Sequence, residues 1–364
     1  MKTKTEQRRS FFQNNAQLLV PLIALGLLII FNLIRDPGFF SVELATNNDG
    51  NPVLQGNLIS ILNGASELVI LAMGMTLVTA AAGGQDISVG CLAAVAGSAF
   101  VKVLKSGAAI TPWLVLAGFL VCCVTAMIFG AFNGTLVSVF RIQPMIATLI
   151  LFTCGRSIAY WINGGATPIV ESPIIKAIGG FIPGVPIPTP ILIVCVMGIF
   201  FALVFRFTTM GLFMQTVGIN QNAARLNGIS AVGMKLLAFV LLGLCCAVSG
   251  VIGVGRLQLI NHETLLLNVE MDAILAVAIG GNSLGGGKFK MIGSVLGAYT
   301  IQALTITLYA MKVSSTDVKA YKAVVIILLV VLGSPVVKNW FSSLKNKSAA
   351  KRLPAGSGKE AAGA

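Results

Sequence analysis

Ten apolar segments follow one another along this chain of 364 residues, and most of them approach the length of a membrane-spanning helix. Such a helix needs roughly 20 mostly apolar residues, so little of the chain remains for a water-soluble domain. Only 10% of the residues are charged, against about 25% in soluble domains. We therefore expect an all-α polytopic membrane protein with about ten transmembrane helices in a lipid bilayer. The segments lie at roughly 18–34, 58–82, 87–104, 113–140, 144–162, 189–206, 234–254, 271–281, 291–311 and 321–337.

The basic residues indicate how the chain is oriented. The net charge is +13, from 25 Lys and Arg against 12 Asp and Glu, and both tails are basic. With both termini in the cytoplasm, sixteen basic residues fall inside and eight outside, in agreement with the positive-inside rule. The excess charge is then an orientation signal and not evidence for a nucleic-acid partner. The expected organisation is a basic cytoplasmic tail at 1–17, a transmembrane domain at 18–337 and a basic, disordered cytoplasmic tail at 338–364.

The sequence offers little material for catalysis or cofactor binding. Its seven cysteines form no C-x-x-C pair, and its single histidine, His262, excludes a multi-histidine metal site. The segment before Lys288 can be tested as a phosphate-binding loop, which needs Gly, four residues, then Gly-Lys-Ser/Thr. Asn282 stands at the first position and Phe289 at the last, so the motif fails. We expect a non-catalytic chain that binds no cofactor, with any ATP hydrolysis in a partner chain.

An internal polar loop at about 217–230 resembles a known docking element. Permeases of ATP-binding-cassette (ABC) importers carry Glu-Ala-Ala-x-x-x-Gly on a cytoplasmic loop. This chain has Asn222, Ala223, Ala224, Arg225 and Gly228 in the corresponding stretch. A short helix with alanine on one face packs closely into a groove of another protein, and a left-handed glycine ends it. The alternative is an ordinary interfacial helix.

Two acids are predicted at membrane depth, where acids are functional candidates by default. Glu67 lies in the second segment and Asp272 at the outer start of the eighth. Carboxylates and amides suit a neutral polyhydroxy substrate. The alternatives are that Glu67 bonds to Asn63 or Ser66, and that Asp272 caps its helix. The residues considered for a substrate pathway are Asn63, Glu67, Asn133, Asp272 and Gln302, and Arg156 is a further polar group within a span.

Glycine recurs in two informative patterns. Residues 83–90 (GGQDISVG) and 280–287 (GGNSLGGG) each end an apolar segment and precede a helix rich in small residues. Glycine-interrupted segments at corresponding places of two halves point to a transport pathway, whereas the simpler interpretation is a turn between helices. The four-residue spacing of Gly130–Gly134 and Gly293–Gly297 predicts closely packed helices.

Taken in order along the chain, these motifs resemble one family. Residues 83–90 are similar to the Gly-Gly-Ile-Asp-Leu-Ser-Val-Gly hallmark of bacterial simple-sugar ABC importer permeases, the ribose, galactose and xylose type. Further matches lie at 142–149, 217–220, 223–228, 272–277 and 280–284, and the whole looks most like the galactofuranose-type permeases. Gln85 in place of Ile and Asn222 in place of Glu are departures. The glycine-motif residues carried over are Gly83, Gly84, Asp86, Ser88, Gly90, Gly280 and Gly281.

The resemblance implies a fold, a function and partners. The fold would be the vitamin-importer-like (type II) ABC permease fold, in the bacterial inner membrane. The chain would carry a monosaccharide into the cytoplasm as the permease subunit of a binding-protein-dependent importer. Its partners would be an ABC ATPase with two fused cassettes, an extracytoplasmic sugar-binding protein and a second permease, identical or related. A permease for an amino acid or another small solute, and an ion-driven secondary transporter, remain as alternatives.

Overall fold

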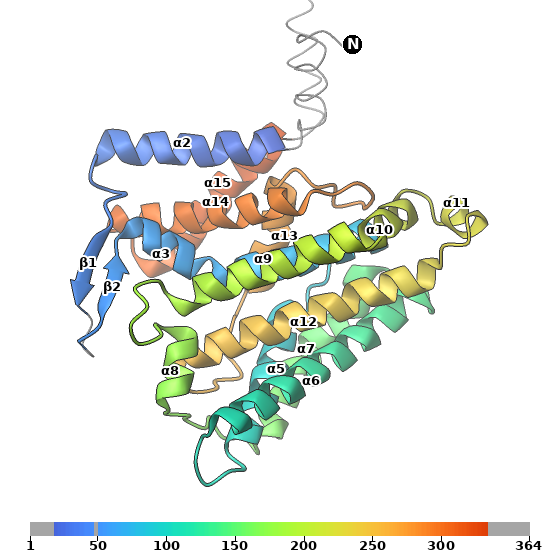
Figure 1. Ribbon diagram of the computed structural model, residues 1–364. Helices are drawn as coiled ribbons and strands as arrows, with labels where there is room; N and C mark the ends of the chain where they lie inside the picture. The colour runs from blue at the N-terminus through green and yellow to red at the C-terminus, as the bar shows by residue number, and fades with distance from the viewer. Residues whose placement is uncertain (1–17, 47–49, 334–364) are drawn as a thin grey trace, which may run out of the picture.

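The computed structural model describes residues 18–46 and 50–333. The two predicted basic tails, 1–17 and 338–364 with their charges, lie outside the described residues, as does the end of the last apolar segment. The described chain is a helical bundle with one small antiparallel hairpin, in which Glu43 pairs with Gln55 and Thr46 with Pro52 (Figure 1).

The elements follow the apolar segments closely. In chain order they are α2 Leu19–Arg35, β1 Glu43–Thr46, β2 Pro52–Gln55, α3 Asn57–Gly64, α4 Ser66–Ala82, α5 Val89–Leu104, α6 Pro112–Ser138, α7 Pro144–Ile162 and α8 Pro173–Gly179. They continue with α9 Thr189–Phe207, α10 Met210–Ile219, α11 Gln221–Leu226, α12 Ala231–Leu257, α13 Val269–Ile279, α14 Met291–Ala310 and α15 Ser315–Gly333.

Each predicted apolar segment coincides with a helix, but fewer helices are long enough to span a membrane alone. Among the described residues, five helices pass by length and composition, and α3 with α4, which are bent by 42°, make a sixth. The helices α5 and α13 have 16 and 11 residues. Both start inside the bundle, where Val89 and Glu270 are buried, so part of each predicted segment is loop. The structure supports a polytopic membrane protein with five to six candidate spans.

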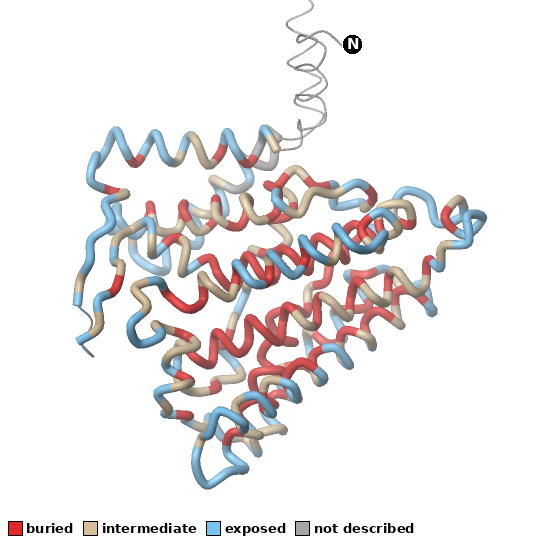
Figure 2. Tube along the Cα trace, viewed as in Figure 1, coloured by how far each residue is buried: buried red, intermediate tan, exposed pale blue. Residues whose placement is uncertain are grey.

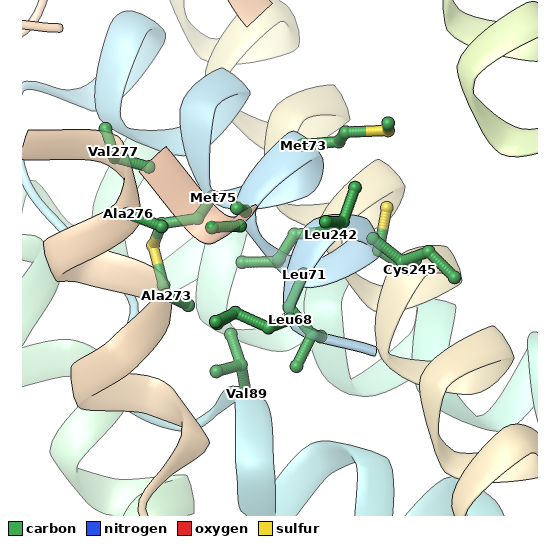
Figure 3. Packing of buried hydrophobic residues seen from close by; sticks show 14 of the residues in the cluster. Leu68, Leu71, Met73, Met75, Val89, Leu242, Cys245, Ala273, Ala276 and Val277 are labelled. Atoms are coloured by element: carbon green, nitrogen blue, oxygen red, sulfur yellow. The ribbon is translucent and has the colours of Figure 1, made fainter. Parts of the chain in front are cut away.

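The centre of the bundle is α4. Ser66 through Ala81 are all buried, and a helix that is apolar around its whole circumference belongs in a core. In Figure 3, Leu68, Leu71 and Met75 of α4 lie among Val89 of α5, Leu242 of α12 and Ala273 and Ala276 of α13. The helices α9, α10, α12, α13 and α14 therefore pack directly around α4.

The remaining long helices divide into inner and outer ones. In its most apolar stretch α12 is 78% buried, whereas α6 and α7 are 28% buried and α9 is 22% buried. Figure 2 shows the exposed positions along the outer faces of these helices. Large apolar side chains such as Ile128 and Val196 are exposed there, as expected of surfaces that face lipid.

Small residues let the helices approach closely, as the four-residue spacing predicts. A Cβ on Gly130 of α6 would collide with the backbone of Phe239 on α12, and one on Gly297 of α14 with the carbonyl of Ala276 on α13. Backbone cannot move aside as a flexible side chain can, so these positions need glycine. The α6–α12 and α13–α14 contacts are thus structural.

The bundle has two distinguishable ends. The short helix α11 projects at one end, and the β1–β2 hairpin and α8 lie at the other (Figure 1). The hairpin is held there by a hydrogen bond from the Leu54 amide to the Pro186 carbonyl (2.9 Å). We name these the α11 end and the hairpin end.

Candidate functional site

A cavity of about 690 Å³ lies between α4, α12, α13, α14 and α15, toward the hairpin end. This volume falls within the range of roughly 300–1,000 Å³ for small-molecule sites. Its lining includes three residues of the predicted substrate pathway, Glu67, Asp272 and Gln302. The wall is completed by Gly64, Leu68, Arg256, Leu266, Leu267, Asn268, Val269, Met271, Leu275, Lys319, Lys322 and Ala323.

On one side of this cavity, Glu67 and Arg256 form a two-point ion pair. Arg256 Nε donates to Glu67 Oε1 (2.6 Å), and Nη2 donates to Oε2 (3.1 Å). The same Nη2 also donates to the carbonyl (2.5 Å) and Oδ1 (3.1 Å) of Asn63. Such forked, charge-assisted bonds are among the stronger ones in proteins. The alternative that Glu67 bonds directly to Asn63 or Ser66 is therefore wrong. Ser66 Oγ donates to the Leu62 carbonyl, and Asn63 is linked to Glu67 only through Arg256.

On the opposite side, Asp272 of α13 pairs with Lys322 of α15. The Lys322 Nζ lies 2.6 Å from Asp272 Oδ2. Asp272 does not cap α13 as the alternative supposed, because the cap position is Asn268, in the left-handed region with φ +64°. Its carboxylate still lies in the first turn of α13, where the helix dipole favours negative charge. The ion pair ties α15 to α13 across one edge of the cavity.

Asn133, the fifth pathway candidate, lies elsewhere. Its side-chain amide donates to Asp86 Oδ2 (3.2 Å) and to Ser88 Oγ (2.9 Å). Asp86 Oδ1 also accepts from the Ser88 amide (2.7 Å) and hydroxyl (2.6 Å). All three residues are at most 1% exposed. They fix the turn between α4 and α5 and do not line the cavity.

In addition to Glu67 and Asp272, two further acids lie inside the bundle, Asp86 and Glu270. Asp86 was assigned only to the glycine motif, and Glu270 was not singled out at all; their exposed fractions are 1% and 2%. Glu270 lies just outside the predicted segment 271–281, two positions before Asp272, after which the apolar run begins. Arg156 is likewise directed away from the cavity, since Nη1 donates to the His262 carbonyl (2.7 Å).

The two glycine-rich stretches lie against each other. Gln85 Nε2 donates to the Leu284 carbonyl (2.8 Å), and the Gly287 amide donates to the Ala80 carbonyl (3.0 Å). Gly83 ends α4 in the left-handed conformation, with φ +68°. The corresponding loop after α13 is closed by Asn282, whose Oδ1 accepts from the Lys290 amide (2.7 Å). These hydrogen bonds thus hold the two glycine-rich stretches, 83–90 and 280–287, together.

The Ala80 carbonyl, which accepts from the Gly287 amide, also links the glycine-rich stretches to α10. Gly218 of α10 lies so close to the Ala80 carbonyl that a Cβ would collide with it. Since α10 leads directly into α11, this contact connects α11 to the end of α4. This connection runs through two glycines, Gly218 and Gly287, that permit backbone-to-backbone contact.

The predicted coupling loop forms the short helix α11. Asn220 precedes it, and its side-chain oxygen accepts from the amides of Asn222 (3.0 Å) and Ala223 (3.1 Å), as an N-cap should. Beyond its C-terminus, Gly228 has φ +75°, and its amide donates to the Arg225 carbonyl (2.9 Å). The left-handed glycine expected from the sequence is present.

The faces of α11 differ from the expectation at one residue. Ala224 is fully buried within the chain, in a small cluster with Val217 and Ala231, so it seats α11 on the bundle and is not free to pack into a partner. Asn222 and Arg225 are exposed, and Leu226 is 89% exposed. The outward surface of α11 therefore consists of polar side chains around one prominent leucine.

Comparisons with known proteins agree on the kind of chain this is. Residues 57–333 match the family described as "Branched-chain amino acid transport system / permease component". The chain is 34% identical over 335 residues to the fructose import permease protein of Bifidobacterium longum, covering 91% of each chain. It is 36% identical over 314 residues to the galactofuranose transporter permease protein of Escherichia coli, covering 86% of this chain and 88% of the relative. The ribose import permease protein of Escherichia coli is 32% identical over 340 residues, with 91% and 98% covered.

Proposed function

The chain belongs to the sugar import permeases of ABC importers, and on that premise we propose that it carries a monosaccharide through the membrane. The observation that supports this most is the cavity of about 690 Å³, whose walls combine paired charges with the side-chain amide of Gln302. A polyhydroxy ligand both donates and accepts hydrogen bonds, so it needs such a mixed lining. The sugar crosses unmodified, and this chain is a transport component with no cofactor of its own.

We place the hairpin end outside and the α11 end in the cytoplasm of a bacterium, in its inner membrane, with both termini cytoplasmic. This orientation puts Arg256, Lys319 and Lys322 near the outer mouth of the cavity. A loaded sugar-binding protein docks on the hairpin end. The helices α2, α5, α13 and α15 complete ten membrane segments of a vitamin-importer-like, type II ABC permease.

Energy for transport enters at α11. An ABC ATPase with two fused cassettes contacts Asn222, Ala223, Arg225 and the exposed Leu226 at the tip of the bundle. When ATP binds, movement of α11 reaches α10, the Ala80 carbonyl and the glycine loops. The two glycine-interrupted halves then shift against each other, and the cavity alternates between outward and inward access. A second permease copy, identical or related, encloses the path from the other side.

An amino acid is the second candidate substrate, because the matching family description names branched-chain amino acids. The cavity carries charges of both signs, Glu67 and Asp272 against Arg256, Lys319 and Lys322, which a zwitterion also needs. Within the described residues, however, Glu67 is paired with Arg256 and Asp272 with Lys322, and the remaining charge, Lys319, is on an exposed residue. A neutral ligand meets the cavity without separating them, and this favours the sugar.

Gln302→Ala tests the cavity as the place where substrate passes. We expect maximal uptake of labelled monosaccharide to fall about five- to tenfold, the value of one lost hydrogen bond of about 1 kcal/mol or slightly more. The loss appears in the maximal rate, because the external binding protein performs the first capture. Uptake is measured in cells that lack the native permease, with labelled fructose, ribose, galactose and leucine offered separately.

The matched control for this variant is Thr305→Ala on the same helix. Thr305 Oγ1 donates to the Ile301 carbonyl of its own helix (2.9 Å) and does not line the cavity, so uptake should stay unchanged. Equal uptake by Gln302→Ala and wild type would remove Gln302 from the pathway. If wild type took up leucine and none of the sugars, the proposed substrate would be an amino acid and not a monosaccharide.

A further inference from the structure

A second cavity, of about 230 Å³, lies at the α11 end of the bundle. It is enclosed by the turn between α6 and α7, by α11 and by the first turns of α12. Arg141, Arg225 and Lys235 line it, one cation from each of these three parts. Of the described residues that line it, none is an acid. The cavity is thus strongly positive on every side.

Hydrogen-bond donors accompany the three cations. The amides of Gln143 and Gln221 line the same cavity, as does the hydroxyl of Ser138. Ser138 is only 6% exposed, and its Oγ is a buried atom with no hydrogen-bond partner among the described residues. A buried hydroxyl without a partner is costly and calls for an explanation. Its position in the wall means that a ligand in this cavity can satisfy it.

The charge of Lys235 needs an explanation for the same reason. Lys235 is 8% exposed, and the ion pairs of the described chain do not include it. A buried ammonium group is expensive unless an anion is paired with it, and two guanidinium groups beside it add repulsion. An anion with several acceptor oxygens between the three cations would balance the cluster.

We propose that this cavity is a phosphate-binding site, filled by the head-group phosphate of an anionic phospholipid or by inorganic phosphate. The oxygens of a phosphate accept forked hydrogen bonds from Arg141, for which a guanidinium group is well suited, and Arg225 adds its positive charge from α11. Lys235 supplies a point charge and Ser138 a hydroxyl. The site is separate from the sugar cavity, and the proposal stands whichever substrate the permease carries.

The surroundings of the turn agree with a lipid as the source. Val139 and Phe140 precede Arg141, and Met145 and Ile146 follow it closely; their exposed fractions are 56%, 66%, 43% and 59%. Exposed apolar side chains directly beside a cation are typical of the level where acyl chains meet head groups. A phospholipid can therefore place its phosphate in the cavity while its chains lie against α6 and α7.

Arg141 offers a variant that leaves the backbone intact. Its φ is +57°, a left-handed conformation that glycine adopts more readily than arginine. Arg141→Gly thus removes one guanidinium without disturbing the turn. Lys235→Met removes the buried ammonium with similar volume. The control is Arg206→Gln, because Arg206 is an exposed cation on the last turn of α9 that does not line the cavity.

The test uses the full-length permease in phosphatidylcholine nanodiscs. In one arm, spin-labelled phosphatidylglycerol and spin-labelled phosphatidylcholine with equal chains are compared by electron paramagnetic resonance for their immobilised fractions. In the other arm, inorganic phosphate is titrated into nanodiscs without anionic lipid and followed by ³¹P line broadening. One cation contributes about fivefold to the affinity for an anionic head group. Arg141→Gly and Lys235→Met should each lose that factor, while Arg206→Gln should keep the wild-type value.

The arms separate the two sources. A preference for phosphatidylglycerol that Arg141→Gly reduces supports the lipid, and broadening of the phosphate signal that the same variant reduces supports free phosphate. No preference and no broadening in the wild type would overturn the proposal. So would equal effects of Arg141→Gly and Arg206→Gln, since attraction would then be a general property of the basic end. A cavity that excludes both probes and is filled by an acidic side chain of the ATPase would overturn it as well.

Discussion

Arg256→Met is expected to lower the free energy of unfolding of the permease by about 3 kcal/mol, the lower end of the cost of breaking a buried ion pair. The lower end applies because the Arg256 side chain keeps 27% of its exposure, against 10% for Glu67. Without the guanidinium, the Glu67 carboxylate loses both of its hydrogen bonds, and two acceptor oxygens of Asn63 lose theirs. Thermal unfolding of the purified variants in detergent measures the loss.

The double variant Glu67→Leu/Arg256→Met separates stability from transport. Replacing both partners of a buried pair by apolar side chains is often neutral for stability, so the melting temperature should return close to that of the wild type. Sugar transport by the double variant should nevertheless be lost, because one wall of the cavity becomes apolar. Glu263→Gln is the control, since Glu263 is exposed and lies 4.0 Å from His262, its nearest ion-pair partner. A single variant as stable as the wild type would contradict the structural role of the pair.

Gly228→Pro should uncouple ATP hydrolysis from transport. Proline fixes φ near −65° and has no amide hydrogen, whereas Gly228 has φ +75° and donates to the Arg225 carbonyl. A proline whose φ does not fit the native conformation destabilises by more than about 1 kcal/mol, and a helix of six residues is marginal on its own. We expect α11 to lose its form while the bundle stays folded. ATP hydrolysis by the reconstituted complex should then no longer rise when the loaded binding protein is added.

Gly228→Asn is the matched variant for this experiment. Asparagine tolerates the left-handed conformation better than other non-glycine residues, and the space around Gly228 is open, with nothing within 4 Å of a Cβ. Stimulation by the binding protein should be largely retained. If Gly228→Pro were stimulated as strongly as Gly228→Asn, α11 would have no part in coupling.

The helices and their close contacts could be predicted from sequence, because length and local spacing decide them. Apolar runs of about 20 residues became helices, and the glycine pairs of α6 and α14 lie at backbone contacts. The count of ten spans stays a prediction, because α5 and α13, with 16 and 11 residues, are too short to pass as spans by length alone. The turn before α5 depends on the buried Asn133, and the loop after α13 depends on Asn282, and only the fold brings these side chains near their partners.

The charged site was harder to predict for a related reason. Glu67 could be singled out because an acid in an apolar run is unusual, but its partner Arg256 is 189 positions away and was assigned to an outer loop. Long-range pairing of this kind leaves no local pattern. Asn133 illustrates the opposite error: the same polarity that marked it as a pathway residue belongs to a turn with Asp86 and Ser88. Ala224 faces inward because the position of α11 on the bundle, not its own sequence, decides which side is free.

Uptake into proteoliposomes tests the central claim most directly. The permease is reconstituted with its ATPase, and the loaded binding protein is added on the side of the hairpin end. Labelled sugar should accumulate only when ATP is present on the side of α11, and an uncoupler that abolishes ion gradients should leave uptake unchanged. Accumulation by the permease alone, driven by an ion gradient and lost with the uncoupler, would contradict the account and identify an ion-driven transporter.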